Sequence, residues 1–180
     1  LLIVAAGITM SVLVSRRLKG HGDGDAAGGG PTDTTILQPS GSEGTTGSWQ
    51  LLLQNAGIAS MHAAVTHQGN VVMLDRTNIG ASQINLPNGK CRDSPLELTL
   101  KHDCSAHSVV FTPGPNTVRP LLIQTDTWCS SGQFLSDGTL VQTGGDFEGL
   151  YKVRRFHPCA SSGTCDWEES TTDFLRNGRW

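Results

Sequence analysis

The sequence predicts an all-β fold for the chain after Trp49, and three features support this prediction. Glycine is abundant, at 22 of 180 residues, which indicates many tight turns. Short runs rich in valine, leucine, isoleucine and threonine are separated by turn dipeptides, namely Gln68-Gly69, Asn88-Gly89 and Asp137-Gly138. No stretch in this region has the apolar spacing of a long helix. Residues 48–180 are therefore predicted to form a β-rich domain.

Two of these turns predict β-hairpins. The apolar run before Gln68-Gly69 continues after it as Val71–Leu74, and the run before Asp137-Gly138 continues as Thr139–Thr143. The two hairpins resemble each other, and Gly144-Gly145 follows the second copy. Such a repeat is typical of kelch-type propellers, in which each blade is a four-stranded antiparallel sheet. A β-sandwich built from similar hairpins gives the same pattern, so the repeat alone leaves both architectures open.

Residues 1–19 predict entry into the secretory pathway. Residues 1–14 carry no charge, and three positive charges follow within residues 16–19. The run matches the roughly 7–15 apolar residues of a signal-peptide core and is shorter than the roughly 20 that span a bilayer. Because the chain begins with Leu1 rather than Met, a signal peptide and a signal anchor both stay open. A buried core helix is the third alternative.

Residues 20–47 are rich in glycine, serine, threonine, aspartate and proline, and this composition predicts a flexible linker. The segment contains Gly22–Ala27, which fits the dinucleotide-binding pattern G-x-G-x-x-G/A. No strand is predicted before this hexapeptide and no helix after it, so we assign it to the linker.

The composition argues against two classes of protein. With 37% hydrophobic residues, 16% charged residues and a net charge of -3, the chain is neither a typical disordered chain nor a nucleic-acid binder. The sequence also lacks the G-x-S-x-G, P-loop and H-E-x-x-H motifs. Hydrolase and nucleotide-dependent activities therefore have no positive support.

The chain contains five cysteines, and in a protein that enters the secretory pathway they indicate disulfide bonds. Cys159 and Cys165 enclose a small flexible loop, and Cys91 and Cys104 flank a 12-residue segment, so we expect these two bridges. They leave Cys129 unpaired, immediately before the second hairpin. An odd cysteine in an oxidising compartment is buried and inert, bonded to another chain, or part of a site.

Three segments of the chain carry a resemblance to a known family. They are CSAHSVVF (Cys104–Phe111), QTDTWCSSGQFLSDGTLVQTGG (Gln124–Gly145) and PCASSGTCDWEE (Pro158–Glu169), with Gly178-Arg179-Trp180 after them. They closely resemble the N-terminal part of glyoxal oxidases, the aldehyde-oxidising relatives of galactose oxidase, and the resemblance covers about residues 48–180. It implies the first blades of a kelch-like seven-bladed β-propeller, incomplete in this chain.

The resemblance also implies a function. Members of this family are secreted copper radical oxidases that convert aldehydes to carboxylic acids while O2 is reduced to H2O2. The cysteine of the W-C-S-S-G motif, here Cys129, forms a thioether with a tyrosine that also binds copper, and the sulfur delocalises the tyrosyl radical. Cys129 is therefore the predicted catalytic residue. The implied partners are a small aldehyde and O2, with no nucleic acid, and with a membrane only if residues 1–14 are an uncleaved anchor.

The other half of that site has no counterpart in the sequence. The family's crosslinked tyrosine directly follows an Arg-Trp pair, so it would stand one position after Trp180. The single tyrosine, Tyr151, lies in a different context, and the family's copper histidines lie much further on. We therefore expect no metal ligand and no other cofactor-binding residue in this segment, and expect the segment alone to be inactive without copper. The complete protein is expected outside the cell, in the cell wall or apoplast.

Other interpretations stay open beside the oxidase. A kelch-like propeller of this lineage could be a non-catalytic binding or cell-wall module, with Cys129 as a buried thiol. Oxidation of alcohols, as in galactose oxidase, is the nearest enzymatic variant. Cys104-x2-His107 could contribute to a zinc site, but a second ligand pair is absent, and ordinary strand histidines explain His62 and His107 better. Among the tryptophans, Trp128 is the candidate for stacking on a ligand.

Overall fold

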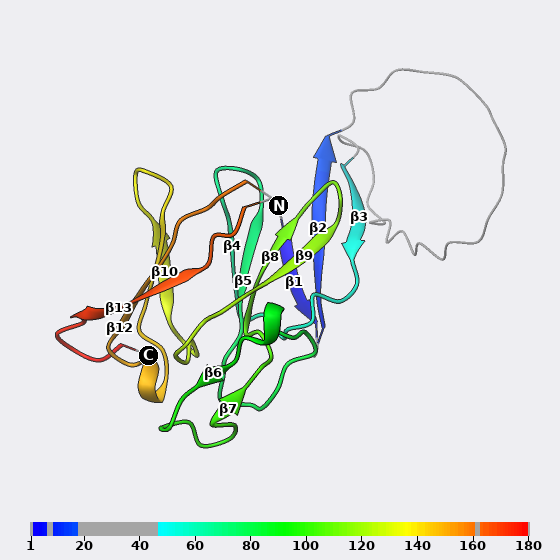
Figure 1. Cartoon of the computed structure of the whole chain (residues 1–180). Coiled ribbons are helices and arrows are strands. Elements are labelled where there is room, and N and C mark those ends of the chain that lie inside the picture. Colours follow the sequence, from blue (N-terminus) through cyan, green and yellow to red (C-terminus); the bar gives the residue numbers. More distant parts are fainter. Residues whose placement is uncertain (1, 7–8, 18–46, 161–162, 180) are drawn as a thin grey trace, which may run out of the picture.

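The structure, a computed structural model, describes residues 2–6, 9–17, 47–160 and 163–179. Its strands pair in antiparallel sheets (Figure 1). The helices among these residues are two 3₁₀ turns, η1 (Pro87–Gly89) and η2 (Phe147–Gly149). Neither has the length or the apolar character that crossing a membrane as a helix requires. The predicted all-β class is confirmed.

The first of two four-stranded sheets contains the first predicted hairpin. In spatial order its strands are β4 (His62–Val65), β5 (Val71–Leu74), β8 (Ser108–Thr112) and β9 (Thr117–Leu121). Val65 pairs with Val71 across the turn, and Gly69 takes the left-handed φ of +82° that this turn requires. β5 is buried along its whole length, because both faces of the sheet are covered.

The second four-stranded sheet contains the second predicted hairpin and repeats this arrangement. Its strands are β10 (Ser131–Phe134), β11 (Leu140–Thr143), β12 (Lys152–Phe156) and β13 (Trp167–Phe174). Phe134 pairs with Leu140, and Gly138 has a φ of +86°. Both hairpin predictions are therefore confirmed, and each hairpin forms half of a four-stranded antiparallel meander.

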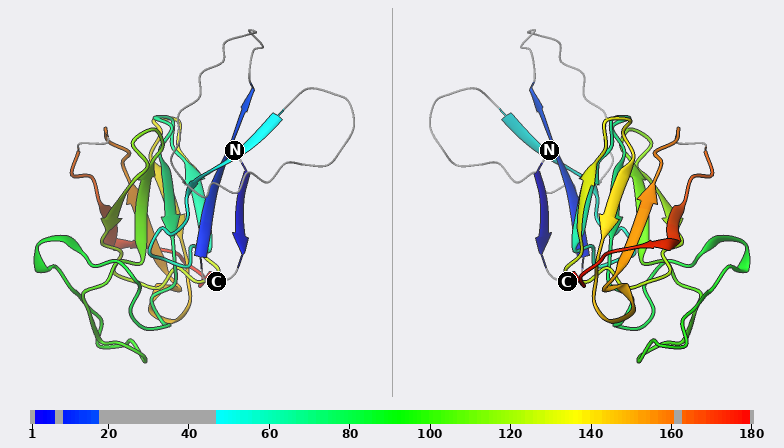
Figure 2. Two further views of the ribbon diagram at one scale, coloured as in Figure 1. Left: turned by 90° about the vertical axis from the view of Figure 1, so that its right-hand side faces the viewer. Right: turned by 90° about the vertical axis from the view of Figure 1, so that its left-hand side faces the viewer.

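The two meanders pack face to face, as the side views in Figure 2 show. Between them lies an apolar core to which β5, β8, β9, β11, β12 and β13 and the residues just after β9 contribute: Val72, Leu74, Val110, Leu121, Ile123, Leu140, Phe156 and Trp167. The Trp167 ring lies 5.4 Å from that of Phe156, and its indole N–H donates to the Ser108 hydroxyl at 2.8 Å. On the opposite face of the first sheet, Met73 and Phe111 pack against Ala56 and Ile58.

A third sheet joins β1 (Leu2–Ala6), β2 (Thr9–Arg17) and β3 (Gly47–Leu53). β3 begins at the predicted boundary of the β-rich domain, and Leu52 and Leu53 pack against the core of the first sheet. The linker prediction falls on residues 20–47, which lie outside the described residues except for Gly47. The signal sequence predicted at residues 1–19 stays a prediction.

A long excursion connects β5 to β8 and carries β6 (Arg92–Asp93) and β7 (His102–Asp103) at its far end (Figure 1). The disulfide Cys91–Cys104 closes it, and a second disulfide joins Cys159 to Cys165. Both predicted bridges are confirmed. They are compatible with an extracellular protein.

Leu121 and Leu98 provide a matched test of the core between the two meanders. Leu121 is 0% exposed, whereas Leu98 is 81% exposed on the excursion. We expect Leu121→Ala to lower the free energy of unfolding by about 2–5 kcal/mol and Leu98→Ala by less than about 0.5 kcal/mol. Equilibrium urea unfolding measures both, and equal losses would contradict this assignment of the core.

Candidate active site

Cys129 lies in a tight turn directly before β10. The Ser130 N–H donates to the Thr127 carbonyl at 3.1 Å, which closes the turn, and Cys129 has a left-handed φ of +57°. This conformation is unfavourable for a residue with a Cβ, and such strain is common at functional sites. Of the five cysteines, Cys129 is the free one, and its side chain is exposed. Among the described residues the Cys129 thiol is therefore not buried.

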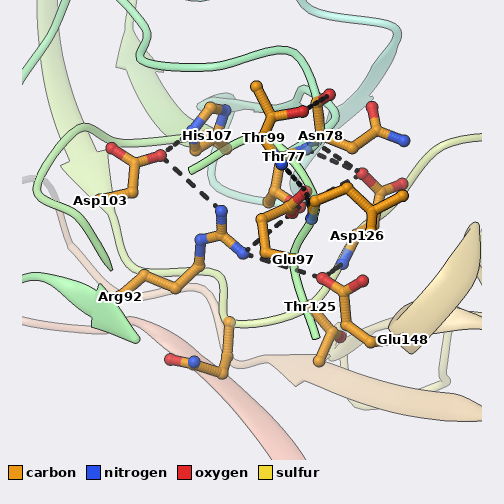
Figure 3. Close-up of polar contacts among 12 residues, drawn as sticks. Thr77, Asn78, Arg92, Glu97, Thr99, Asp103, His107, Thr125, Asp126 and Glu148 are labelled. Carbon is orange, nitrogen blue, oxygen red and sulfur yellow. Dashed lines mark hydrogen bonds and ion pairs between the residues drawn. The ribbon is translucent and has the colours of Figure 1, made fainter. Parts of the chain in front are cut away.

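The buried carboxylate of Asp126 holds this turn against the segment that follows β5. Asp126 is 0% exposed. One oxygen accepts the Trp128 N–H at 2.6 Å. The other accepts the backbone N–H of Thr77 at 3.0 Å, that of Asn78 at 3.2 Å and the Thr77 hydroxyl at 3.2 Å (Figure 3). Because four donors from two segments converge on one buried carboxyl group, the two segments are fixed relative to each other.

Hydroxyl groups on either side of Cys129 complete the anchoring of the turn. The Thr127 hydroxyl donates to the Asp75 carbonyl at 2.6 Å. The Ser130 hydroxyl donates to the Thr127 carbonyl at 2.7 Å and accepts the Gln142 amide at 2.6 Å. Thr127 and Ser130 are both buried, so the exposed pair between them is presented on a fixed backbone.

The glycine pair after β11 brings the last described residue beside this turn. The Gly145 N–H donates to the Arg179 carbonyl at 2.8 Å. A Cβ on Gly145, whose φ is +136°, would lie 1.8 Å from the Asp126 carbonyl oxygen. Only glycine therefore fits between the Asp126 segment and Arg179. The backbone that precedes Trp180 and the backbone that precedes Cys129 approach each other through this single residue.

Arg154 supports the same segment from β12. Its buried guanidinium donates to the Thr125 hydroxyl, to the Asp126 carbonyl at 2.8 Å and to the Gly144 carbonyl at 2.5 Å, and it forms an ion pair with Glu169 at 3.6 Å. Burial lowers the pKa of Arg154 below its ordinary value, while the nearby carboxylates oppose this shift. Arg154 therefore ties the second sheet to the Asp126 segment.

A second buried arginine, Arg92, connects the excursion to η2. Its guanidinium lies 3.5 Å from Glu97, 3.7 Å from Glu148 and 3.8 Å from Asp103 (Figure 3). Burial raises the pKa of Glu148 above its ordinary 4.5, hydrogen bonds from backbone N–H groups lower it in part, and the charges of Glu97 and Asp126 raise it further.

Asp103 has the opposite shift. Burial alone would raise the pKa of its carboxyl, but hydrogen bonds from Ser105 and His107 bring it below the ordinary 3.8. The His107 Nε2 lies 2.7 Å from the Asp103 carboxylate. His107 is therefore a buried histidine, directly before β8, whose Nε2 is paired with Asp103, while its buried Nδ1 has no hydrogen-bond partner among the described residues.

The described residues do not fit a copper ion. In the described part of the chain, one group of three places metal-type ligand atoms within 4.8 Å of one another, and it consists of Cys91, His102 and Cys104. Because Cys91 and Cys104 form a disulfide, they offer no thiolates, which also argues against the zinc alternative. Tyr151 is exposed in the turn before β12.

Arg76 is the site residue that sequence reasoning missed. Its guanidinium carbon lies 4.5 Å from the centre of the Trp128 ring, which is 36% exposed. The available signal was the charged Asp75-Arg76 pair at the end of a fully apolar strand. Arg154 was missed as well, although it shares the inward face of β12 with Phe156.

Two glycines separate the effect of backbone conformation from that of close approach. Gly69 has a φ of +82° and open space around it, whereas a Cβ on Gly145 would collide with Asp126. We expect Gly69→Ala to cost about 1–2 kcal/mol, and Gly145→Ala to cost clearly more, on the order of 3 kcal/mol or above. Urea unfolding of both variants tests this, and equal costs would show that the close approach is not needed.

Glu148 predicts a pH dependence of stability. Because its pKa is higher in the folded protein, the folded state binds more protons just above pH 4.5, and the free energy of unfolding falls as the pH rises through that window. In Glu148→Gln this decline should be smaller, and the part that remains is expected from Asp166, whose pKa is also raised by burial. Asp103 acts in a different window, since its stabilising contribution is lost as the pH falls below 3.8. Parallel stability curves for wild type and Glu148→Gln between pH 4.5 and 7 would contradict the prediction.

Comparisons with known proteins identify the family of the chain. The model of the family described as Glyoxal oxidase N-terminus matches residues 61–180. The chain is 59% identical over 134 residues to the protein named Aldehyde oxidase GLOX of Vitis pseudoreticulata. The aligned region covers 74% of this chain and 26% of the relative. The chain is 39% identical over 125 residues to Aldehyde oxidase GLOX1 of Arabidopsis thaliana, covering 68% of this chain and 20% of the relative.

The chain therefore spans about a quarter or less of the length of these curated relatives. No solved structure matches it. The matched family region contains both meanders, both disulfides and the Cys129 turn. On this evidence, the chain belongs to the Glyoxal oxidase N-terminus family.

Proposed function

We propose that this chain is the N-terminal part of a secreted copper radical oxidase that oxidises aldehydes, and that Cys129 supplies the sulfur of its Cys-Tyr thioether. Family membership and the names of the two relatives, both aldehyde oxidases, support the reaction class. The two disulfides support an oxidising destination. The activity belongs to the whole protein, of which copper ligands outside the described residues are a necessary part.

The observation that carries the proposal is the presentation of Cys129. A free thiol lies exposed on a strained turn whose neighbours, Asp126, Thr127 and Ser130, are all buried and hydrogen-bonded. An incidental surface cysteine would not require a left-handed backbone held by so many partners. A sulfur that must meet one position of an aromatic ring does require a fixed location.

The proposed partner of Cys129 is a tyrosine directly after Trp180, as the family resemblance implies. The hydrogen bond from Gly145 to Arg179, together with the contact of Gly145 with Asp126, supports this pairing. It holds the backbone one residue before Trp180 next to the backbone that leads into Cys129. The crosslink would then join two segments that already lie close together.

The proposal includes a propeller architecture, in which the two meanders are the first two blades. β4 and β10 are edge strands of their sheets and would be the innermost strands. Cys129, at the start of β10, would then face the central channel. The packing of the two meanders through one apolar core supports this assignment, because adjacent blades bury the faces of their sheets against each other.

The overall reaction balances without a further reductant or oxidant. Water adds to the aldehyde to give its hydrate, RCH(OH)2. The hydrate then loses two electrons and two protons and becomes the carboxylic acid, and O2 takes up both and becomes H2O2. Copper bound to the complete protein would supply the redox chemistry.

The thioether can be tested by mass spectrometry of the complete protein, expressed through the secretory pathway and loaded with copper. We expect the intact mass to fall by the mass of two hydrogen atoms on copper loading, and a Cys129 peptide to appear joined to a peptide from beyond Trp180. Cys129→Ser should abolish both signals and should also abolish the release of H2O2 from aldehydes. Cys129→Gly is a useful second variant, because it removes the sulfur while relieving the left-handed strain.

The outcomes separate the candidate functions. An unchanged mass in a copper-loaded, folded protein would contradict the proposed role of Cys129. H2O2 release from primary alcohols but not from aldehydes would favour the galactose-oxidase-like variant. A folded protein that neither binds copper nor releases H2O2 would favour a non-catalytic module.

A further inference from the structure

Arg76 places a cationic group over the ring of Trp128, the residue that precedes Cys129. It follows β5 directly, and its half-buried side chain lies over the Trp128 ring, with 4.5 Å between the guanidinium carbon and the ring centre. Trp128 is the immediate neighbour of Cys129 in the turn. A guanidinium stacked on an aromatic face is stabilised by the ring's quadrupole while its N–H edges stay available to a ligand.

The backbone around Arg76 is fixed. Its own N–H donates to the Asp75 carboxylate at 2.8 Å, and the same carboxylate accepts the Ala59 N–H at 2.9 Å. On the other side, Thr77 is held by Asp126. Asp75, Thr77 and Asp126 are all buried. The backbone that carries the Arg76 side chain is therefore fixed, and stacking on Trp128 restricts the position of the guanidinium.

Among the described residues, the Arg76 guanidinium has no carboxylate partner in ion-pair distance. This distinguishes it from Arg92 and Arg154, which are buried in ion pairs, and from Arg155, which pairs with Asp173 at 3.3 Å on the surface. Arg76 is half-buried and stacked, yet its fork of N–H donors is uncommitted. Such a fork matches the two oxygens of a carboxylate.

We propose that Arg76 is a specificity-determining residue that binds the carboxylate of an aldehyde substrate carrying an acid group. The guanidinium would hold the carboxylate in two parallel hydrogen bonds, with Trp128 as the back wall and the aldehyde end directed toward the Cys129 side of the turn. The inference rests on the proposed oxidase function. It adds to that function a preference for anionic over neutral aldehydes and names the residue responsible.

The test compares two substrates of similar size on the complete, copper-loaded protein. Glyoxylate carries a carboxylate where glyoxal carries a second aldehyde. We expect Arg76→Gln to lower kcat/KM for glyoxylate on the order of 10- to 100-fold more than for glyoxal, mainly through KM, since charged hydrogen bonds contribute about 1.5–3 kcal/mol. Arg76→Lys, which keeps the charge but loses the fork, should recover part of the difference. Arg155→Gln is the matched control and should leave the ratio unchanged.

Equal losses for both substrates, or an unchanged glyoxylate-to-glyoxal ratio, would overturn the proposal. If Arg76→Gln fails to fold, the ratio in Arg76→Lys decides: a value equal to that of wild type overturns the proposal, and a lowered one supports it.

A second measurement does not depend on turnover. Saturation-transfer NMR with acetate should show binding to wild type that is lost in Arg76→Gln and kept in Arg155→Gln. Wild type that oxidises no aldehyde would refute the proposed function. Acetate binding unaffected by Arg76→Gln would refute the role of Arg76.

Discussion

The buried carboxylate of Asp126 is the interaction on which the rest of the site depends. It accepts four hydrogen bonds, one from the Cys129 turn and three from Thr77 and Asn78 in the segment that follows β5. Its backbone carbonyl also receives Arg154 and lies against Gly145. A buried charge is tolerated only when it is fully hydrogen-bonded, so each of these donors must be in place when the chain is folded. Asp126 thus fixes the Cys129 turn, the segment after β5, Gly145 and Arg154 of β12 relative to one another. Together they form a rigid frame that carries the exposed thiol of Cys129.

The buried arginines extend this frame and explain its polarity. In the second sheet, Arg154 forms an ion pair with Glu169 and donates to the Asp126 carbonyl. Arg92 forms ion pairs with Glu97, Asp103 and Glu148 where the excursion meets η2. Apolar packing joins the sheets through their faces, whereas the loops at one end are joined by charges. The loops therefore keep fixed geometry without an apolar core of their own. Arg76 differs from both arginines because its guanidinium stacks on Trp128 and forms no ion pair among the described residues.

The fold class, both hairpins, both disulfides and the unpaired Cys129 could be predicted, because each has a local signal in turn residues, strand periodicity or cysteine spacing. The pairing of the meanders and the partners of Asp126 could not. These contacts join residues that are far apart in the chain, such as Thr77 and Asp126, whose positions differ by 49. They depend on which loops meet after folding. Sequence patterns also gave no indication that Arg92 and Arg154 would be buried, since arginine is usually exposed. The resemblance to glyoxal oxidases pointed to Cys129, but its left-handed, anchored turn and its stacked neighbours emerged only in three dimensions.

We propose that this frame holds Cys129 against an aromatic ring contributed by the chain just after Arg179. A crystal structure of the complete, copper-loaded protein would show whether it does. We expect continuous density between the Cys129 sulfur and a ring carbon of a tyrosine that follows Trp180, with the Asp126 hydrogen bonds and the Gly145 contact preserved. A free Cys129 thiol in such a structure, with the backbone after Trp180 leading away from the turn, would contradict it.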